Sequence, residues 1–405
     1  MGFPLLASTK TLLIKLGTRV VTQSADNCPD ELATDRLYTL VEEISQLQKT
    51  GIQCLLVSSG AVGLGRKKLG LGSKKLTLAQ KQAAAAVGQA YLMNFYCEAF
   101  QKHNIQTAQV LVTSKDFSNR SSLLNLSRLF DELAQLNVVP ILNENDSTSI
   151  SEISEEEEKS FGDNDRLAAL LASQFSADLL ILLSDVDGVY TENPLINPQA
   201  KKIDELKAED FKKNKINFSG AHLHSLSRGG MSSKVEAALL ASESGVTTII
   251  ASGFKAQVLT KCLNAQTQNE LPGTIIPPQS KNALRKRWLA WMSGYQGSVV
   301  VDEGAQNALK KGKSLLFAGI KSVSGTFSPD SVIRILDEEG QELGRGLSQS
   351  SDEFAQLCLG KKSDEISFRF NSLCLVPNTV QSTTIFNFGV RFLENQEEAD
   401  FEYCW

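Results

Sequence analysis

The amino-acid sequence predicts an α/β protein: an open, mostly parallel sheet sandwiched by helices, followed by a small β-rich C-terminal domain. Over residues 11–252, short apolar runs typical of strands alternate with segments of helical periodicity, and this alternation favours a parallel sheet with crossover helices. The runs are apolar almost throughout, which is typical of strands buried on both faces. From about residue 298, short strand-like segments with glycine-containing turns predict the second domain.

The first domain is expected to contain six strands with helices between them. A helix is predicted from about Pro29 to Gly51, because proline suits a first helical turn and glycine suits a helix end. Its apolar residues recur on one face, and they are Leu37, Leu40, Val41, Ile44 and Leu47. An alanine-rich helix is predicted over residues 77–100. The predicted strands span residues 11–17, 52–60, 105–113, 137–144, 178–185 and 247–252.

Small or polar residues follow four of these strands where each strand ends. In an open parallel sheet, ligands bind beyond the carboxyl ends of the strands, so we expect these segments to meet at one edge and form a site. The segments are Lys15–Gly17, Ser58–Gly60, Asn143–Asp146 and Ser184–Asp187.

Composition excludes several classes of protein. The chain has 405 residues, is 42% hydrophobic and carries a net charge of −5, which disfavours broad attraction to nucleic acid or to an anionic membrane. No apolar run reaches the roughly 18 residues of a membrane span, and the N-terminus lacks the basic region of a signal peptide. Seven scattered cysteines without a C-x-x-C pair are typical of free thiols in the cytoplasm.

Glycine-rich segments were weighed as phosphate sites. GAVGLG (60–65) matches the dinucleotide fingerprint poorly, and GKS (312–314) lacks the first glycine of a P-loop. Residues 229–234, GGMSSK, are a better candidate, because glycines at a helix start offer N–H groups to phosphate and Lys234 adds a mobile charge. A plain helix-capping loop would have the same composition. Lys15, at the end of the first strand, is placed to meet a ligand.

Acidic and amide side chains gather in two segments, NENDS (143–147) and FGDND (161–165). Carboxylates at the carboxyl edge of a sheet can bind an amine, hold Mg²⁺ or hold lysines in place, and the residues leave these options open. The DVDG segment lacks the further ligands of an EF-hand, and the three histidines have no metal-site spacing, so no protein metal site is predicted.

At this point the chain resembles the glutamate 5-kinase family of the amino-acid kinase superfamily. The resemblance rests on IKLGT, VSSGAVGLGR, KQAAAAVGQ, VVPILNENDS, FGDNDRLAAL, LLSDVDGVYTENP and GGMSSKVEAA, in that order over residues 11–275. The segment VDEGAQNALKKGKSLLFAGIKSVSGTFSPDSVIRI resembles the PUA domain that many members carry. The resemblance implies a catalytic domain at 1–276 and a PUA-like domain at 297–378. The proline-rich segment PGTIIPPQS (272–280) indicates a linker, placed at 277–296, and residues 379–405 are predicted to be an irregular acidic tail.

The resemblance implies ATP-dependent phosphorylation of the glutamate γ-carboxylate, the first step of proline synthesis, with Mg²⁺ accompanying ATP. The implied catalytic residues are Lys15, Asp165 and Lys234. The implied glutamate-binding residues are Ser59, Asn145, Asp146, Asp163 and Asn164. The implied ATP-binding residues are Lys15, Gly17, Ser184, Asp185, Arg228, Gly229, Gly230, Met231, Ser232, Ser233 and Lys234.

Three departures from the family pattern stand out, and one is that the usual ending of the PUA domain is not recognisable after about Leu375. Arg228 precedes the glycine pair where the family has Gly-Thr-Gly-Gly-Met. The segment between Asp146 and Asp163 is longer than usual, and its Glu155–Glu158 run is expected to be a solvated loop. Residues 281–405 hold 14 Lys/Arg and 16 Asp/Glu, a net of −2, so RNA binding, which other PUA domains perform, is not expected here.

The expected partners are ATP and L-glutamate, with no membrane and a cytoplasmic location. The family implies a homo-oligomer and hand-off of the product to glutamate-5-semialdehyde dehydrogenase. Two alternatives stay open. One is a kinase for another small acid, such as N-acetylglutamate or aspartate, although the acidic segments favour a substrate with a free amine. The other is a catalytically weak regulatory or RNA-binding protein on the same scaffold, which an intact set of Lys15, Asp165 and Lys234 disfavours.

Overall fold

The chain forms two compact units. One comprises Met1–Asp116 and Arg120–Asn282, and the other comprises Phe117–Asn119 and Ala283–Trp405. The computed structural model describes residues 5–23, 31–72, 74–118, 120–148, 164–194, 196–207, 230–279, 295–311, 315–329, 331–359, 367–368 and 370–375. The predicted linker at 277–296 and tail at 379–405 fall mostly or wholly outside these residues, so their bounds stay predictions.

The first unit is built on a seven-stranded sheet with the strand order β11-β10-β7-β1-β4-β6-β5. All neighbours are parallel except β10 and β11. This confirms the predicted open, mostly parallel sheet. The strands are β1 (Thr11–Leu16), β4 (Gln53–Ser58), β5 (Thr107–Val112), β6 (Val139–Glu144), β7 (Leu179–Ser184), β10 (Thr247–Ser252) and β11 (Gly273–Ile276).

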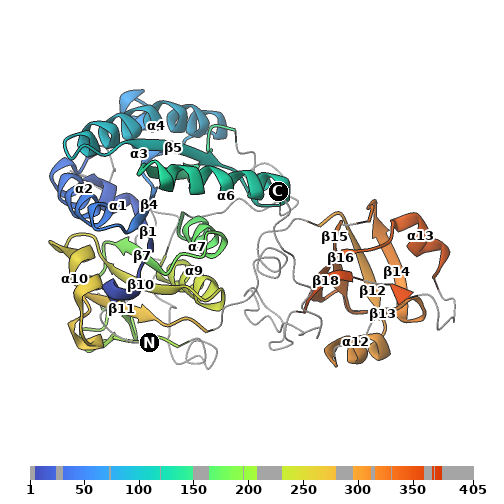
Figure 1. The fold of residues 1–405 in the computed structure, drawn as a ribbon. Helices are drawn as coiled ribbons and strands as arrows, with labels where there is room; N and C mark the ends of the chain where they lie inside the picture. Colours follow the sequence, from blue (N-terminus) through green and yellow to red (C-terminus); the bar gives the residue numbers. More distant parts are fainter. Residues whose placement is uncertain are drawn as a thin grey trace. The chain divides into compact units, whose positions relative to one another are not determined.

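Helices cover both faces of this sheet, with α2 and α10 on one side and α6, α7 and α9 on the other (Figure 1). The helices of the unit are α1 (Thr18–Val21), α2 (Thr34–Lys49), α3 (Ala61–Lys68), α4 (Leu78–Gln101), α5 (Ser114–Ser118), α6 (Arg120–Gln135), α7 (Asn164–Gln174), α9 (Met231–Glu243) and α10 (Val258–Asn264). Short elements are η1 (Leu5–Ser8), β2 (Thr22–Gln23), β3 (Glu31–Leu32), β8 (Val189–Tyr190), β9 (Lys202–Ile203) and η2 (Gln268–Glu270). No helix within the described ranges has both the length and the apolarity to cross a bilayer.

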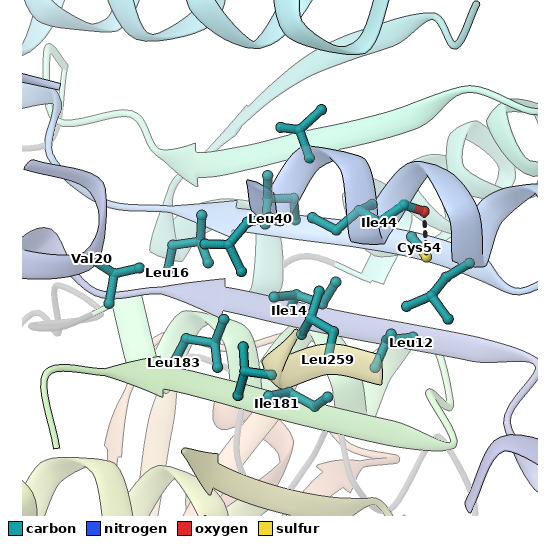
Figure 2. Close-up of a cluster of buried hydrophobic side chains, with 14 of the residues drawn as sticks. Leu12, Ile14, Leu16, Val20, Leu40, Ile44, Cys54, Ile181, Leu183 and Leu259 are labelled. Atoms are coloured by element: carbon teal, nitrogen blue, oxygen red, sulfur yellow. Dashed lines mark hydrogen bonds between the residues drawn. The ribbon is translucent and has the colours of Figure 1, made fainter. Parts of the chain in front are cut away.

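Alternation along β1 decides which side chains face which helices. Leu12, Ile14 and Leu16 belong to the buried cluster that α2 and α10 cover, where they lie beside Leu40 and Leu259 (Figure 2). Successive side chains of a strand point to opposite faces, so Lys15 lies on the face that α7 covers. The alternation of side chains along β1 therefore places Lys15, the first lysine of the predicted site, on the face opposite that cluster.

One predicted helix boundary was wrong, and one strand was not predicted. Helix α2 begins at Thr34, not near Pro29, because Glu31–Leu32 pairs with β2 and keeps the chain extended there. Its predicted apolar face is buried, and Gly51, at a φ of 93°, follows its end. The proline-rich segment PGTIIPPQS (272–280) contains strand β11, whose β-branched residues pair with β10 and which ends before the predicted linker at 277–296. The first unit therefore uses these residues in its sheet.

The backbones of α3 and α4 approach each other closely through two glycines. A β-carbon on Gly65 would lie 1.7 Å from the carbonyl oxygen of Ala84, and one on Gly88 would lie 1.8 Å from that of Ala61. Only glycine fits at such distances. Gly65 in the GAVGLG segment thus serves helix packing. The contact also holds the start of α3 in place, two residues after Ser59, which is predicted to bind the substrate.

The second unit is β-rich, as predicted. Its five-stranded sheet has the order β14-β12-β15-β16-β18, and its core includes Val299, Phe317, Ile333 and Ile335. The strands are β12 (Gly297–Val301), β13 (Leu315–Leu316), β14 (Ile320–Gly325), β15 (Val332–Leu336), β16 (Glu342–Ser348), β17 (Ser367–Phe368) and β18 (Phe370–Leu375). Helices α12 (Glu303–Lys310), η4 (Phe317–Gly319) and α13 (Asp352–Leu357) complete it.

Candidate active site

The centre of the candidate site is a buried carboxylate held between two lysines. Oδ1 of Asp165 lies 2.7 Å from Nζ of Lys15, and its Oδ2 lies 2.9 Å from Nζ of Lys234. The three residues are 0%, 2% and 8% exposed, respectively. The structure thus brings together all three residues predicted to be catalytic, although they are separated by more than half of the chain.

Three elements place these side chains. Lys15 precedes the last residue of β1, while Asp165 and Lys234 lie in the first turns of α7 and α9. The two helices lie side by side against the same face of the sheet (Figure 1). A carboxylate is favoured at a helix start by the partial positive charge there. The same partial charge disfavours the ammonium group of Lys234 at the start of α9, and its ion pair with Asp165 offsets this repulsion.

The electrostatics of the centre keep Asp165 ionised. Burial alone would raise the pKa of its carboxyl, but the charges of Lys15 and Lys234 and the hydrogen bonds that they donate hold that pKa well below its usual range. The three side chains together carry a net charge of +1. Such a group of charges can be buried because each is paired, and its remaining charge suits an anion.

Amide side chains form a second part of the site, at the ends of β4 and β6. Nδ2 of Asn164 donates to Oγ of Ser59 at 3.0 Å and to Oδ1 of Asn143 at 2.9 Å. Nδ2 of Asn143 donates to Oε1 of Gln89 at 3.0 Å. Two residues predicted to bind the substrate, Ser59 and Asn164, therefore lie in contact, and Asn164 directly precedes the central Asp165.

Sequence reasoning did not single out Gln89, although it ends the KQAAAAVGQ segment. The signal was available: Gln89 lies between the buried positions Ala85 and Leu92 on α4, one turn away from each. A polar side chain on a buried helix face must find a hydrogen-bond partner. Its partner is Asn143 at the candidate site.

The turn after β6 carries the predicted residues Asn145 and Asp146, and both are half-buried. The backbone N–H of Asn145 donates to the Val112 carbonyl at 2.8 Å, and the Ser147 hydroxyl donates to Oδ1 of Asn145 at 2.6 Å. The first bond ties the turn to the end of β5, and the second lies within the turn. Asp163 and the run Glu155–Glu158 lie outside the described residues.

The ends of β1 and β7 form the third part. The N–H of Gly17 donates to the Leu183 carbonyl at 3.0 Å. The Ser184 hydroxyl donates to Oδ1 of Asp185 at 2.9 Å, and Nη1 of Arg19 lies 2.9 Å from its Oδ2. Burial opposes ionisation of Asp185, but the Ser184 hydroxyl, a backbone N–H and Arg19 lower its pKa. Arg19 was not predicted, although it follows Gly17 by two residues in a strand-end segment.

Only part of the predicted glycine loop is described. Gly230 caps α9, the Ser233 hydroxyl donates to the Gly230 carbonyl at 2.9 Å, and Met231 and Ser232 open the helix. This part of the loop leads directly to Lys234 at the centre. Arg228 and Gly229 lie outside the described residues.

Comparison with known proteins agrees with this architecture. A family model described as the amino acid kinase family matches residues 10–252. The chain belongs to the amino acid kinase family. A model of the PUA domain matches residues 297–370, in the β-rich second unit of this amino acid kinase.

Relatives match over almost the whole length of this family member. A glutamate 5-kinase of Trichlorobacter lovleyi is 39% identical over 363 residues, which are 89% of this chain and 93% of the relative. A glutamate 5-kinase of Trichormus variabilis is 40% identical over 362 residues, 89% of this chain and 94% of the relative. One of Ruegeria sp. is 41% identical over 361 residues, with shares of 89% and 94%. The resemblance to glutamate 5-kinases inferred from the motifs is thereby confirmed.

Proposed function

We propose that this chain transfers the γ-phosphoryl group of ATP to the γ-carboxylate of L-glutamate, giving γ-glutamyl 5-phosphate in the first step of proline biosynthesis. The observation that carries the reaction type is the buried pairing of Lys15 and Lys234 with Asp165. The names of the full-length relatives supply the acceptor. We place the reaction in the cytoplasm, as composition favours.

The chemistry needs charge neutralisation more than acid–base catalysis. A carboxylate oxygen of glutamate attacks the γ-phosphorus, the bond from that phosphorus to the oxygen bridging it to the β-phosphate breaks, and ADP leaves with the electron pair. The attacking carboxylate is already ionised near neutral pH, so no general base is required. Two anions must meet, and catalysis of phosphoryl transfer consists mainly of positioning and electrostatic stabilisation.

The central residues fit that requirement. The ammonium groups of Lys15 and Lys234 approach from β1 and α9, and Asp165 orients both. In this proposal the lysines stabilise charge on the transferring phosphoryl group, while Asp165 keeps them in place before the nucleotide arrives. Preorganised charges of this kind cost no rearrangement in the transition state.

Glutamate recognition is assigned to the amide-rich part of the site. The residues assigned are Ser59 and Asn164, which are in mutual contact: Asn164 donates to the Ser59 hydroxyl and positions it, and that hydroxyl keeps its own hydrogen for a substrate carboxylate. Asn145, Asp146 and Asp163 are assigned to the remaining polar groups of glutamate. The carboxylates of Asp146 and Asp163 suit its α-ammonium group. The acidic pair favours a substrate whose amine is free.

Nucleotide binding is assigned to the edge formed by β1, β7 and the start of α9. The residues are Lys15, Gly17, Ser184, Asp185, Arg228, Gly229, Gly230, Met231, Ser232, Ser233 and Lys234. Mg²⁺ that accompanies ATP would supply further neutralisation of the phosphate charges. Within the described ranges, no group of three His, Cys, Asp or Glu side chains could hold a metal ion. Phosphate oxygens, water and the hard oxygen donors of Asp185 fit the ligand set that Mg²⁺ prefers.

The wider partners belong to the same proposal. We assign the chain to a homo-oligomer, and we assign the labile acyl phosphate to direct use by glutamate-5-semialdehyde dehydrogenase. The PUA unit is assigned a role in stability, assembly or regulation and not in RNA binding, because the charge of residues 281–405 is weakly negative.

The test traps the acyl phosphate. The full chain is incubated with ATP, Mg²⁺, hydroxylamine and one candidate acid: L-glutamate, L-aspartate or N-acetyl-L-glutamate. We expect hydroxamate to form with L-glutamate and much less with the other two. Hydroxamate with N-acetylglutamate or aspartate in its place would identify the rival kinases. No hydroxamate with any of the three would favour the non-catalytic alternative.

A further inference from the structure

We infer that Arg19 is a third phosphate-binding cation, which exchanges the carboxylate of Asp185 for phosphate oxygens of the nucleotide when the nucleotide binds. The inference rests on the proposed function, and it adds a residue that the amino acid kinase motifs above do not include. In the structure, Nη1 of Arg19 lies 2.9 Å from Oδ2 of Asp185. The side chains of the pair are 48% and 34% exposed, respectively.

The ion pair of Arg19 joins the ends of two strands that border the buried centre. Strands β1 and β7 are hydrogen-bonded neighbours, with Leu16 opposite Leu183. A β-carbon on Gly17 would lie 3.9 Å from Nζ of Lys15 and 3.9 Å from Cα of Ser184. Gly17 therefore lies between the lysine at the centre and the residue that precedes Asp185. Arg19 reaches across this same junction to pair with Asp185.

The backbone that carries Arg19 is firmly held. Helix α1 has only four residues, which is too short to be stable alone. Nη1 of Arg36 donates to the carbonyls of Arg19 at 3.0 Å and Val20 at 2.9 Å, so it satisfies two of the carbonyls that a helix end leaves open. A β-carbon on Gly253 would lie 2.6 Å from a methyl of Val20, so that valine is packed against the end of β10.

The two arginines differ in what their guanidinium groups are committed to. The guanidinium of Arg36 lies 3.9 Å from the centroid of the Phe254 ring as well as binding the two carbonyls of α1. It therefore serves to position α1. The guanidinium of Arg19, anchored at its backbone, forms an ion pair at a half-exposed position, and such exposed pairs contribute little to stability.

Charge makes the exchange favourable. Together, Asp165 and its two lysines carry a net charge of +1, whereas a nucleoside triphosphate brings several negative charges. A planar guanidinium binds phosphate oxygens through paired hydrogen bonds. When Arg19 turns to the phosphates, Asp185 keeps the hydrogen bond that the Ser184 hydroxyl donates to its Oδ1. The exchange thus leaves neither partner without a bond.

A structural reading competes with this one: Arg19 could act only by holding Asp185 in place. Measuring ADP binding to the full chain by calorimetry distinguishes these two explanations. Four proteins are compared: wild type, Arg19→Ala, Asp185→Asn and the double variant. Lys67→Ala is the matched control, since Lys67 forms an exposed ion pair with Glu31 in the same unit. Thermal unfolding checks that every variant is folded.

We expect Arg19→Ala to raise the Kd for ADP by about tenfold to hundredfold, the range of a charge-assisted hydrogen bond. Arg19→Lys should recover part of this loss, because lysine keeps the charge without the planar fork. Lys67→Ala should leave the Kd unchanged. In the Asp185→Asn background, Arg19→Ala should retain most of its effect. An unchanged Kd in Arg19→Ala, or an effect that vanishes once Asp185 is replaced, overturns the inference.

A second measurement decides the matter if Asp185→Asn alone abolishes ADP binding. The ³¹P resonances of bound ADP should shift between wild type and Arg19→Lys, because the contacting cation changes. Identical resonances would overturn the inference. Wild-type protein that binds neither ADP nor ATP would instead remove the proposed function, and the inference with it, so the two failures are distinguishable.

Discussion

The buried centre and the exposed rim of the candidate site use the same kinds of charge in different ways. At the centre, Asp165 and its two lysines are at most 8% exposed. At the rim, Arg19 pairs with Asp185, and Lys255 with Asp187, through side chains that are 34% to 48% exposed. Buried charges cannot lose a partner cheaply, whereas exposed ones can exchange it for a ligand or water. The centre is therefore preassembled, and the rim is free to respond.

Asp165→Asn tests the centre most severely. The substitution leaves two lysines buried without their carboxylate, and breaking such a buried pair costs about 3 kcal/mol or more in the free energy of unfolding. Turnover should fall by about a thousandfold or more, since the lysines lose their orientation. Urea unfolding and the hydroxamate assay measure the two effects.

Asp187→Asn is the matched comparison at the rim, and its cost in unfolding free energy should stay below about 1 kcal/mol. Equal destabilisation by the two substitutions would break the contrast between centre and rim.

Lys234→Ala should lower kcat by about a hundredfold to a thousandfold, the loss typical of removing one preorganised charge from a transition state. The KM for glutamate should change little, because the ammonium group is assigned to the transferring phosphoryl group. Steady-state kinetics with both substrates measure this. Unchanged turnover would refute the assigned role.

Asp146→Ala tests the half-buried turn after β6. We expect it to raise the KM for glutamate by about tenfold, since it removes one charge-assisted contact to the α-ammonium, with a smaller change in kcat. Asp146→Asn should fall between wild type and alanine. An increase confined to the KM for ATP would contradict the assignment.

The smallest expected effect is a pH dependence confined to acid. The pKa of Asp165 is lowered in the folded protein, so its pairing contributes stability above the ordinary carboxyl pKa and loses it only as pH falls toward the lower, folded value. The difference in unfolding free energy between wild type and Asp165→Asn should be constant from about pH 8 to about pH 5 and shrink below about pH 4. A difference that stays constant below about pH 4, or one that grows as pH falls, would show that the pKa is not lowered.

Much of the fold could be predicted because it depends on local patterns. Apolar runs and helical periodicity located the strands and the α2 face, and these patterns reflect burial. The wrong helix start and the strand that was not predicted both arose where a tertiary partner decided the conformation. Glu31–Leu32 is extended because it pairs with β2, and Gly273–Ile276 is a strand because β10 lies beside it. The residues of those two segments do not by themselves indicate which strand they will pair with.

The site divides in the same way. By itself, the sequence determined which residue types stand at the strand ends and which family they resemble. It was enough to identify Lys15, Lys234 and the acidic and amide segments. Only the tertiary structure decided that one carboxylate touches both lysines, that Gln89 supports Asn143, and that Arg19 reaches Asp185. The physical reason is that hydrogen bonds and ion pairs act over a few ångströms, and the packing of β1, β7, α7 and α9 brings distant residues within that range.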